Sequence, residues 1–306
     1  FTFFTLAIIY AGVQNGIERV SKFMMPVLVV LSVIIAGYSI SRPGAFEGVK
    51  YFLIPNFDNF SWMTVVSAMG QMFYSLSIAM GILITFGSYM KKDVSIEGST
   101  ENVEIFDTAI AIMAGLMIIP AVFSFSGGNM ETLKAGPSLM FITIPKVFAS
   151  MGLGTGIGII FFLLVLFAAI TSSIALTESA VSTFQDELHW SRKKSTIILG
   201  IIMIGLGTLS CLGYGPLSNV TIIGMQFLDF FDFLTNSVMM PIAAIAICIF
   251  VSRVVGLEKV EAEITKDGNS FKRKKIFNLM IQYLCPIFAF IILLSSIANA
   301  FGFISM

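Results

Sequence analysis

Charged side chains are scarce in this sequence. They make up 12% of the 306 residues, compared with about 25% in an ordinary soluble domain, whereas 57% of the residues are hydrophobic. Positive and negative charges are equal in number, and no long block carries one sign, so the sequence lacks the charge pattern of a nucleic-acid-binding protein. The composition therefore argues against both a water-soluble domain and a nucleic-acid partner.

Metal-binding and nucleophilic side chains are also few. The one histidine is His189, and the three cysteines, Cys211, Cys248 and Cys285, lie far apart within apolar segments. No paired spacing indicates a disulfide scaffold, a zinc site or thiol catalysis. No nucleophile with an adjacent base is evident either, so we expect a protein that is not an enzyme.

Long apolar runs, in contrast, are abundant. A hydrocarbon core of about 30 Å needs roughly 20 helical residues to cross it. Runs of that length occur near residues 23–40, 61–90, 104–126, 153–184, 196–213, 220–252 and 276–302. The apolar start at residues 1–10 is interpreted as the remainder of an eighth helix, and 139–150, interrupted by Pro145 and Lys146, as a short helix that does not cross. The pattern predicts an all-α polytopic membrane protein.

The positive residues predict the orientation in the membrane, because cytoplasmic loops retain Lys and Arg. All but four of the 18 Lys and Arg residues fall in the loops 14–22, 91–103, 185–195 and 253–275; the exceptions are Arg42, Lys50, Lys134 and Lys146. These four loops are therefore predicted to face the cytosol, with Met306 on the outside.

Three groups of polar residues are predicted at a similar depth in the membrane, where such groups usually face a cavity or one another. They are Ser75 and Ser77 in the middle of 61–90, Asp107 in 104–126, and Thr171-Ser172-Ser173 in 153–184. Hydroxyls in membrane helices often bond only their own backbone, which is the competing interpretation of the Thr-Ser-Ser run. A carboxylate at the depth of Asp107 is costly unless it is paired, protonated or bound to a cation, which favours a functional role.

The segment 61–90 is about ten residues longer than one span requires. A break near Ser75 to Gly81 would free backbone groups at the midplane, as transporters do, although tilt alone would also explain the length. Hydroxyls, freed carbonyls and one carboxylate are the oxygen ligands that a hard cation such as sodium prefers.

Several motifs resemble, in the same order, those of the neurotransmitter:sodium symporter family, most of all its bacterial amino acid transporters. They are Gly16-Ile17-Glu18-Arg19 before Met25-Pro26, Gln71 to Gly81 before Tyr89-Met90-Lys91-Lys92-Asp93, Thr171-Ser172-Ser173-Ile174-Ala175 before Asp186-Glu187-Leu188, and Ser191-Arg192-Lys193. The resemblance covers essentially the whole chain. It implies a LeuT-like fold that contains the second inverted repeat plus flanking helices, with one broken helix.

The resemblance also implies an organisation of the chain. Residues 1–60 would be the end of the fourth helix and the fifth helix of the first repeat. Residues 61–254 would be the second inverted repeat of five helices, and 255–306 a cytosolic loop and the final transmembrane helix. The first three helices of the family would then precede residue 1, including the first helix, which provides half of the family's substrate and sodium sites, and we expect the 306-residue chain alone not to transport.

Carried over residue by residue, the resemblance implies two sodium sites. One would use Ser75 and Asp107, and the other the carbonyl of Ala168 with the hydroxyls of Thr171 and Ser172. The substrate pocket would include Tyr74, Ser77, Met80, Ser172 and Leu176, with Tyr74 as an aromatic lid. Asp232 would belong to an outer gate, and Tyr89 and Asp186 to an inner gate, each with a partner outside this chain. Because Asp107 is often Asn in chloride-dependent relatives, we hypothesise that its charge removes the need for chloride.

The expected function is sodium-coupled symport of a neutral, apolar or aromatic amino acid by alternating access, in the bacterial cytoplasmic (inner) membrane. An ion channel, which would conduct without saturable sodium-dependent uptake, and a partner-binding membrane scaffold are the alternatives. The role of Glu178 stays open between a water-filled inner path and a paired structural acid.

Overall fold

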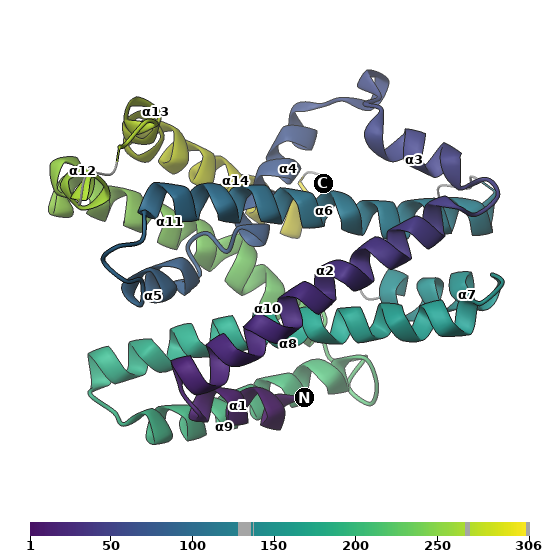
Figure 1. The fold of residues 1–306 in the computed structure, drawn as a ribbon, viewed down its shortest axis with the longest axis horizontal. Coiled ribbons are helices and arrows are strands. Elements are labelled where there is room, and N and C mark those ends of the chain that lie inside the picture. Colours follow the sequence, from purple (N-terminus) through teal and green to yellow (C-terminus); the bar gives the residue numbers. More distant parts are fainter. Residues whose placement is uncertain (128–135, 137, 267–269, 304–306) are drawn as a thin grey trace. The chain divides into compact units, whose positions relative to one another are not determined.

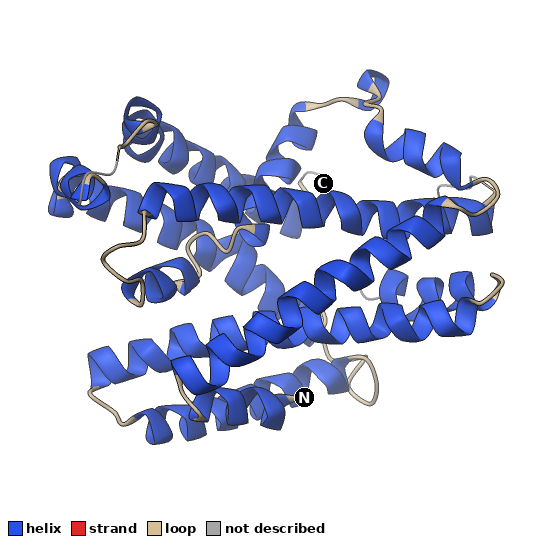
Figure 2. Cartoon of the chain, in the orientation of Figure 1, coloured by secondary structure: helices blue, strands red, loops and turns tan. Residues whose placement is uncertain are grey.

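In the residues that the computed structural model describes, all regular structure is helical, apart from one isolated β-bridge between Ile222 and Met225 (Figures 1 and 2). The structure describes residues 1–127, 136, 138–266 and 270–303. Lys134, on which part of the orientation argument rests, lies outside them, as does part of the predicted cytosolic loop 253–275. The α-helices are α1 (Thr2–Tyr10), α2 (Arg19–Ile40), α3 (Ala45–Leu53), α4 (Trp62–Ser75), α5 (Ile82–Ser88), α6 (Ile96–Ser126), α7 (Ile144–Ala149), α8 (Gly154–Leu188), α9 (Arg192–Gly213), α10 (Phe227–Asp232), α11 (Met240–Ile249), α12 (Leu257–Ile264), α13 (Lys274–Leu279) and α14 (Cys285–Ala300).

Short π-helical turns extend several of these helices. Val13–Glu18 precedes α2, Leu139–Thr143 precedes α7, Phe233–Met239 joins α10 to α11, Phe250–Val255 follows α11, and Met280–Leu284 joins α13 to α14. Including these turns, six helices in the described residues are long and apolar enough to cross a membrane: 13–40, 96–126, 154–188, 192–213, 227–255 and 274–300. Six of the predicted spans are therefore confirmed as single helices, and the seventh, 61–90, is divided into α4 and α5.

Several boundaries differ from the sequence-based ones. The span predicted from residue 220 begins at Phe227, because the largely apolar, glycine-containing stretch before it forms turns instead of helix. The α6 helix begins at Ile96 instead of 104, since the Ser95 hydroxyl accepts from the Gly98 amide at 3.2 Å and caps a charged first turn. The stretch 139–149 is a short helix, as expected.

The chain forms two compact units, which are described separately. The first contains Ala7–Asn59 and Ile105–Ile174, and the second contains Thr2–Leu6, Phe60–Glu104 and Ala175–Met306. In the first unit, α2, α6, α7 and α8 share one hydrophobic core that includes Ile35, Val122 and Phe161. The short helix α3 crosses α6 closely, because Gly48 leaves room for Pro120: a Cβ at residue 48 would lie 2.9 Å from its Cα.

The core of the second unit holds the broken helix in place. Phe73 of α4, Met240 and Ala244 of α11, and Ala289 and Ile292 of α14 are buried together, and residues 78–80 of the connection between α4 and α5 pack against them. The break is thus seated on a packed surface from α11 and α14.

Candidate functional site

The predicted interruption of the segment 61–90 is present. The α4 helix ends at Ser75, and α5 starts at Ile82 after a non-helical connection. Three of the six connecting residues have a positive φ: Ser77 at 55°, Ala79 at 63° and Gly81 at 77°. For residues with a side chain this conformation costs about 1–2 kcal/mol each. Such strain persists only where the surrounding structure enforces it, and it marks functional sites more often than others.

The connection leaves backbone polar groups available. The amides of Leu76, Ser77 and Ile78 still donate to carbonyls of α4, and α5 resumes with the Thr85 amide donating to the Gly81 carbonyl at 2.9 Å. Among the described residues, the amides of Ala79 and Met80 form no backbone hydrogen bond. Groups of this kind are the ones that can bind an ion or a charged substrate group.

The second half of the broken helix, α5, contacts α8 through three residues spaced four apart: Gly81, Thr85 and Tyr89. A Cβ at Gly81 would lie 2.8 Å from Oγ of Ser179, so only glycine allows this approach. One turn later, the Thr85 hydroxyl donates to Oγ of Ser179 at 3.4 Å, and a further turn on, the Tyr89 hydroxyl donates to Oε1 of Glu178 at 2.9 Å. The helical period brings the side chains of Thr85 and Tyr89 to the face on which Gly81 approaches α8.

Glu178 forms the centre of a buried charged cluster. Its carboxylate is fully buried and accepts two hydrogen bonds from the Arg192 guanidinium, from Nη1 at 3.0 Å and from Nη2 at 2.5 Å. Arg192 is the first residue of α9, directly after Ser191, whose hydroxyl caps the helix by accepting from the Lys194 amide. Of the two readings left open for Glu178, the geometry matches the paired acid. The sequence showed both residues, but nothing in it indicated that they pair.

The two residues implied for the inner gate are placed differently. Tyr89 belongs to the Glu178 cluster. Asp186 lies two turns farther along α8, where the Ser182 hydroxyl donates to its Oδ2 at 3.5 Å. The contact between Tyr89 and Glu178 was not anticipated.

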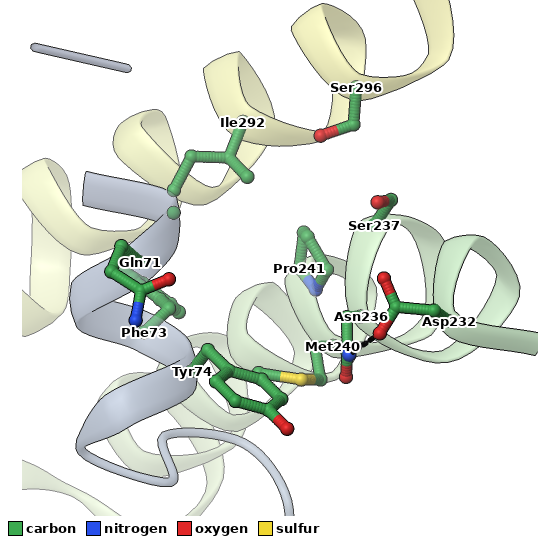
Figure 3. A pocket seen from close by; sticks show the side chains of 11 residues that line it. Gln71, Phe73, Tyr74, Asp232, Asn236, Ser237, Met240, Pro241, Ile292 and Ser296 are labelled. Carbon is green, nitrogen blue, oxygen red and sulfur yellow. Dashed lines mark hydrogen bonds between the residues drawn. The ribbon is translucent and has the colours of Figure 1, made fainter. Parts of the chain in front are cut away.

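A cavity of about 430 Å³ opens beside α4 (Figure 3). Gln71 and Tyr74 of α4 form one wall, and Asp232 and Asn236 the other, with Nδ2 of Asn236 donating to Oδ1 of Asp232 at 2.6 Å. The remaining lining residues are Gly70, Phe73, Ser237, Met240, Pro241, Ile292 and Ser296. The cavity thus brings together Tyr74 and Asp232, which the resemblance assigned to the lid and the outer gate.

The proposed α8 ligands form a compact group on one helix. Oγ1 of Thr171 donates to the carbonyl of Ala168 at 2.9 Å and to that of Phe167 at 3.1 Å. Ala168, Ser172 and Leu176 are each four residues apart and therefore share one face of α8. The backbone bond of Thr171 is the competing interpretation noted above, yet it leaves the lone pairs of the hydroxyl oxygen available as acceptors.

The remaining predicted pairings join residues of different units. Ser75 belongs to the second unit and Asp107 to the first, and Tyr74, Ser77 and Met80 are likewise divided from Ser172. The first sodium site and the complete substrate pocket therefore stay predictions. Asp107 is the twelfth residue of α6 and partly buried.

Comparison with known proteins identifies the class. A family model described as "Sodium:neurotransmitter symporter family" matches residues 2–303. A crystal structure of MhsT in complex with L-phenylalanine is similar, with 37% identity and a TM-score of 0.82 over 96% of this chain and 66% of that one. This likeness confirms the LeuT-like fold of a multi-pass membrane protein. The chain belongs to the sodium:neurotransmitter symporter family, which is a family of transporters and not of enzymes.

Two curated relatives are both described as sodium-dependent transporters. YhdH of Bacillus subtilis, an uncharacterized sodium-dependent transporter, is 35% identical over 268 residues, which are 88% of this chain and 58% of that protein. An uncharacterized sodium-dependent transporter of Haemophilus influenzae is 32% identical over 96% of this chain and 63% of its own length. The chain thus spans less than two thirds of these relatives.

Proposed function

We propose that the complete protein is a sodium-coupled symporter that takes up a neutral, apolar or aromatic amino acid by alternating access, in the cytoplasmic membrane of a bacterium. The observation that carries the proposal is the break between α4 and α5. Its strained residues Ser77 and Ala79, and the amides left without a backbone partner, supply polar groups in the middle of a segment that is otherwise apolar.

The sodium sites are proposed from oxygen-bearing groups on three helices. Ser75 at the end of α4 and Asp107 of α6 form the first, and the Ala168 carbonyl with the Thr171 and Ser172 hydroxyls forms the second. The position of Ala168 and Ser172 on one face of α8, with lone pairs of the Thr171 hydroxyl oxygen still able to accept, supports the second site. Sodium coordinated by these groups shares the site with substrate, so that each raises the affinity of the other.

The substrate class is proposed from the character of the pocket side chains. Tyr74, Met80 and Leu176 offer an aromatic ring, a flexible thioether and an aliphatic side chain, which suit an apolar or aromatic side chain. Ser77 and Ser172 supply hydroxyls for polar groups of the ligand. The similar structure, MhsT, holds L-phenylalanine.

The gates are proposed on opposite sides of this pocket. Asp232, exposed beside the 430 Å³ cavity, serves the outer gate. Tyr89 and Asp186 serve the inner gate, where Tyr89 reaches the buried Glu178 and Arg192 pair.

Chloride is proposed to be unnecessary. A sodium ion next to Asp107 already has a local negative charge, so an external anion adds little. Uptake that collapsed when gluconate replaced chloride would contradict this point alone.

The test is uptake of radiolabelled amino acids by the complete transporter in proteoliposomes, with and without a sodium gradient. We expect saturable uptake of apolar or aromatic amino acids that requires sodium. Thr171→Val should raise the sodium concentration for half-maximal uptake about tenfold or more, which corresponds to ~1.4 kcal/mol of lost binding. Thr183→Val is the matched control, because Thr183 also lies on α8 and donates to a carbonyl one turn back, that of Ser179, at 2.9 Å.

Conductance without saturable uptake would instead favour a channel. A preference for charged amino acids would contradict the proposed substrate class, and equal effects of Thr171→Val and Thr183→Val would contradict the second sodium site.

A further inference from the structure

Three glutamates line one face of the first turns of α6, on the side predicted to be cytosolic. Glu97, Glu101 and Glu104 are spaced four and three residues apart, which brings them to the same face of a helix. Like charges at this spacing repel one another, so an uncompensated row would destabilise the start of α6.

Two consecutive residues that precede α13 compensate all three acids. Nη1 of Arg273 donates to Oε2 of Glu104 at 2.9 Å, and Nη2 lies 3.4 Å from Oε1 of Glu101. The backbone amides of Lys272 and Arg273 donate to the two carboxylate oxygens of Glu97 at 3.3 and 3.2 Å. We refer to these five residues as the cytosolic clamp.

Two further contacts lie beside the clamp, one at the start of α13 and one at the end of α5. Nζ of Lys274 lies 2.5 Å from Oε1 of Glu261, which ties the start of α13 to α12. A cavity of about 100 Å³ lies between the end of α5 and the end of α12; its lining residues include Met90, Lys91 and Ile96 on one side and Glu263 and Ile264 on the other. The α5–α6 connection therefore lies beside α12 at this cavity, and the start of α6 contacts the residues before α13 through the clamp.

We propose that the cytosolic clamp holds the start of α6 against the segment before α13, and that its release accompanies opening of the transporter toward the cytosol. The inference rests on the proposed alternating access, in which the cytosolic ends of some helices must separate. The α5 helix is the half of the broken helix that follows the break, and it leads into α6. A restraint on the start of α6 therefore acts on the element that carries the proposed binding groups.

The strength of the clamp suits a contact that forms and breaks in each cycle. The side chains of Arg273, Glu101 and Glu104 are 53%, 41% and 58% exposed, so each ion pair is worth little and is screened by salt. The hydrogen bond to Glu104 is the main reason why the pKa of Arg273 lies above its usual value. An arginine side chain is charged at physiological pH in any case, so salt and substitution, not pH, are the ways to weaken the clamp.

The test measures access to the cavity beside the clamp in the complete transporter. A Met90→Cys variant, in which Cys211, Cys248 and Cys285 are replaced by alanine, is labelled with a hydrophilic maleimide from the cytosolic side. Adding Arg273→Gln should speed labelling about threefold to tenfold at low salt, as expected for the loss of a small ion-pair network. The difference should shrink in 1 M salt, where the screening length is about 3 Å.

Two further variants separate the clamp from a general effect of charge or misfolding. Lys275→Gln removes a charge from the start of α13 without removing a clamp contact, and it should leave the labelling rate unchanged. Arg273→Glu combined with Glu104→Arg and Glu101→Gln re-forms one pair with reversed charges and removes the acid that would face the new carboxylate. It should label more slowly than Arg273→Glu alone, which a misfolded protein would not do.

Labelling of Arg273→Gln within twofold of the parent at low salt, in a transporter that takes up substrate with sodium, would overturn the clamp and leave the proposed function intact. Absence of sodium-dependent uptake by the parent would overturn the proposed function, and with it the transport role of the clamp.

Discussion

Two acids of the second unit, Asp232 and Glu178, differ in their burial and in the charge of their partners. Asp232 is exposed beside a cavity of about 430 Å³, and its carboxylate accepts a hydrogen bond from the neutral amide of Asn236. Glu178 is fully buried and is satisfied by the guanidinium of Arg192 and the hydroxyl of Tyr89. An exposed acid with a neutral neighbour remains able to attract a cation or a donor from elsewhere, whereas a buried and paired acid cannot be released without a large cost.

These different surroundings suit the two acids to different roles, one structural and one in gating. The Glu178 cluster joins α5, α8 and α9 and so fixes where the second half of the broken helix lies. The Asp232 carboxylate contributes little to that framework and can serve a gate. Substitutions that test this division are expected to differ in how they affect stability and uptake.

The largest effect is expected from Arg192→Ala. This substitution leaves the carboxylate of Glu178 buried without its cation, which destabilises proteins by about 3–5 kcal/mol. A strong fall in the thermal unfolding temperature of the detergent-solubilised transporter is the measurement. Replacing both residues by apolar ones, as Glu178→Leu with Arg192→Met, should restore most of the stability, because an apolar pair needs no compensation. If the double variant were as unstable as Arg192→Ala, charge burial would not be the cause.

Gly81→Ala should have the next largest effect. Residue 81 has a φ of 77°, which costs about 1–2 kcal/mol once a Cβ is present, and that Cβ would meet Oγ of Ser179 at 2.8 Å. We expect lower thermal stability and weaker substrate binding. Gly87→Ala is the matched control in the same helix, since nothing lies within 4 Å of its Cβ and alanine favours helix by about 1 kcal/mol. Equal behaviour of the two variants would contradict the close approach of α5 to α8.

The break between α4 and α5 could be predicted because its causes are visible in the residue pattern. Ser75, Ser77 and Gly81 are polar or small residues in the middle of an apolar segment that is too long for one span. Length and hydrophobicity likewise predicted the long helices, because lipid imposes both. The start of α10 at Phe227 was missed, since the apolar residues of 214–226 look like membrane residues but form turns.

The pairings between elements were harder to predict. Nothing in the sequence indicates that Glu178 receives Arg192, because their contact depends on how α9 turns back along α8. The clamp was missed for the same reason: Glu97 and Arg273 are 176 positions apart. The joint site of Ser75 and Asp107 stays a prediction, as do the repeat boundaries at residues 61 and 254.

Tyr89→Phe should have a smaller effect than either substitution above. It removes one hydrogen bond to Glu178, while both bonds from Arg192 remain, so we expect a loss of about 1 kcal/mol in stability. If Tyr89 also serves the inner gate, labelling of a cysteine at residue 90 from the cytosol should become faster. Stability reduced as much as in Arg192→Ala would mean that the hydroxyl contributes as much to the stability of the cluster as the guanidinium, which would contradict the expected order.

The smallest effect on stability is expected from Asp232→Asn. Asparagine can still accept the hydrogen bond from Nδ2 of Asn236, so the variant changes the charge and keeps the local contact. Thermal stability should stay close to that of the parent, because an exposed charge contributes little to folding. The role proposed for Asp232 in the outer gate predicts that the KM for the amino acid rises up to about fivefold, the range of an exposed ion pair. Asn236→Ala, which removes the neutral partner and keeps the acid, is the control and should change KM less. A stability loss in Asp232→Asn without a change in KM would mean that Asp232 has the structural role and not the gating role.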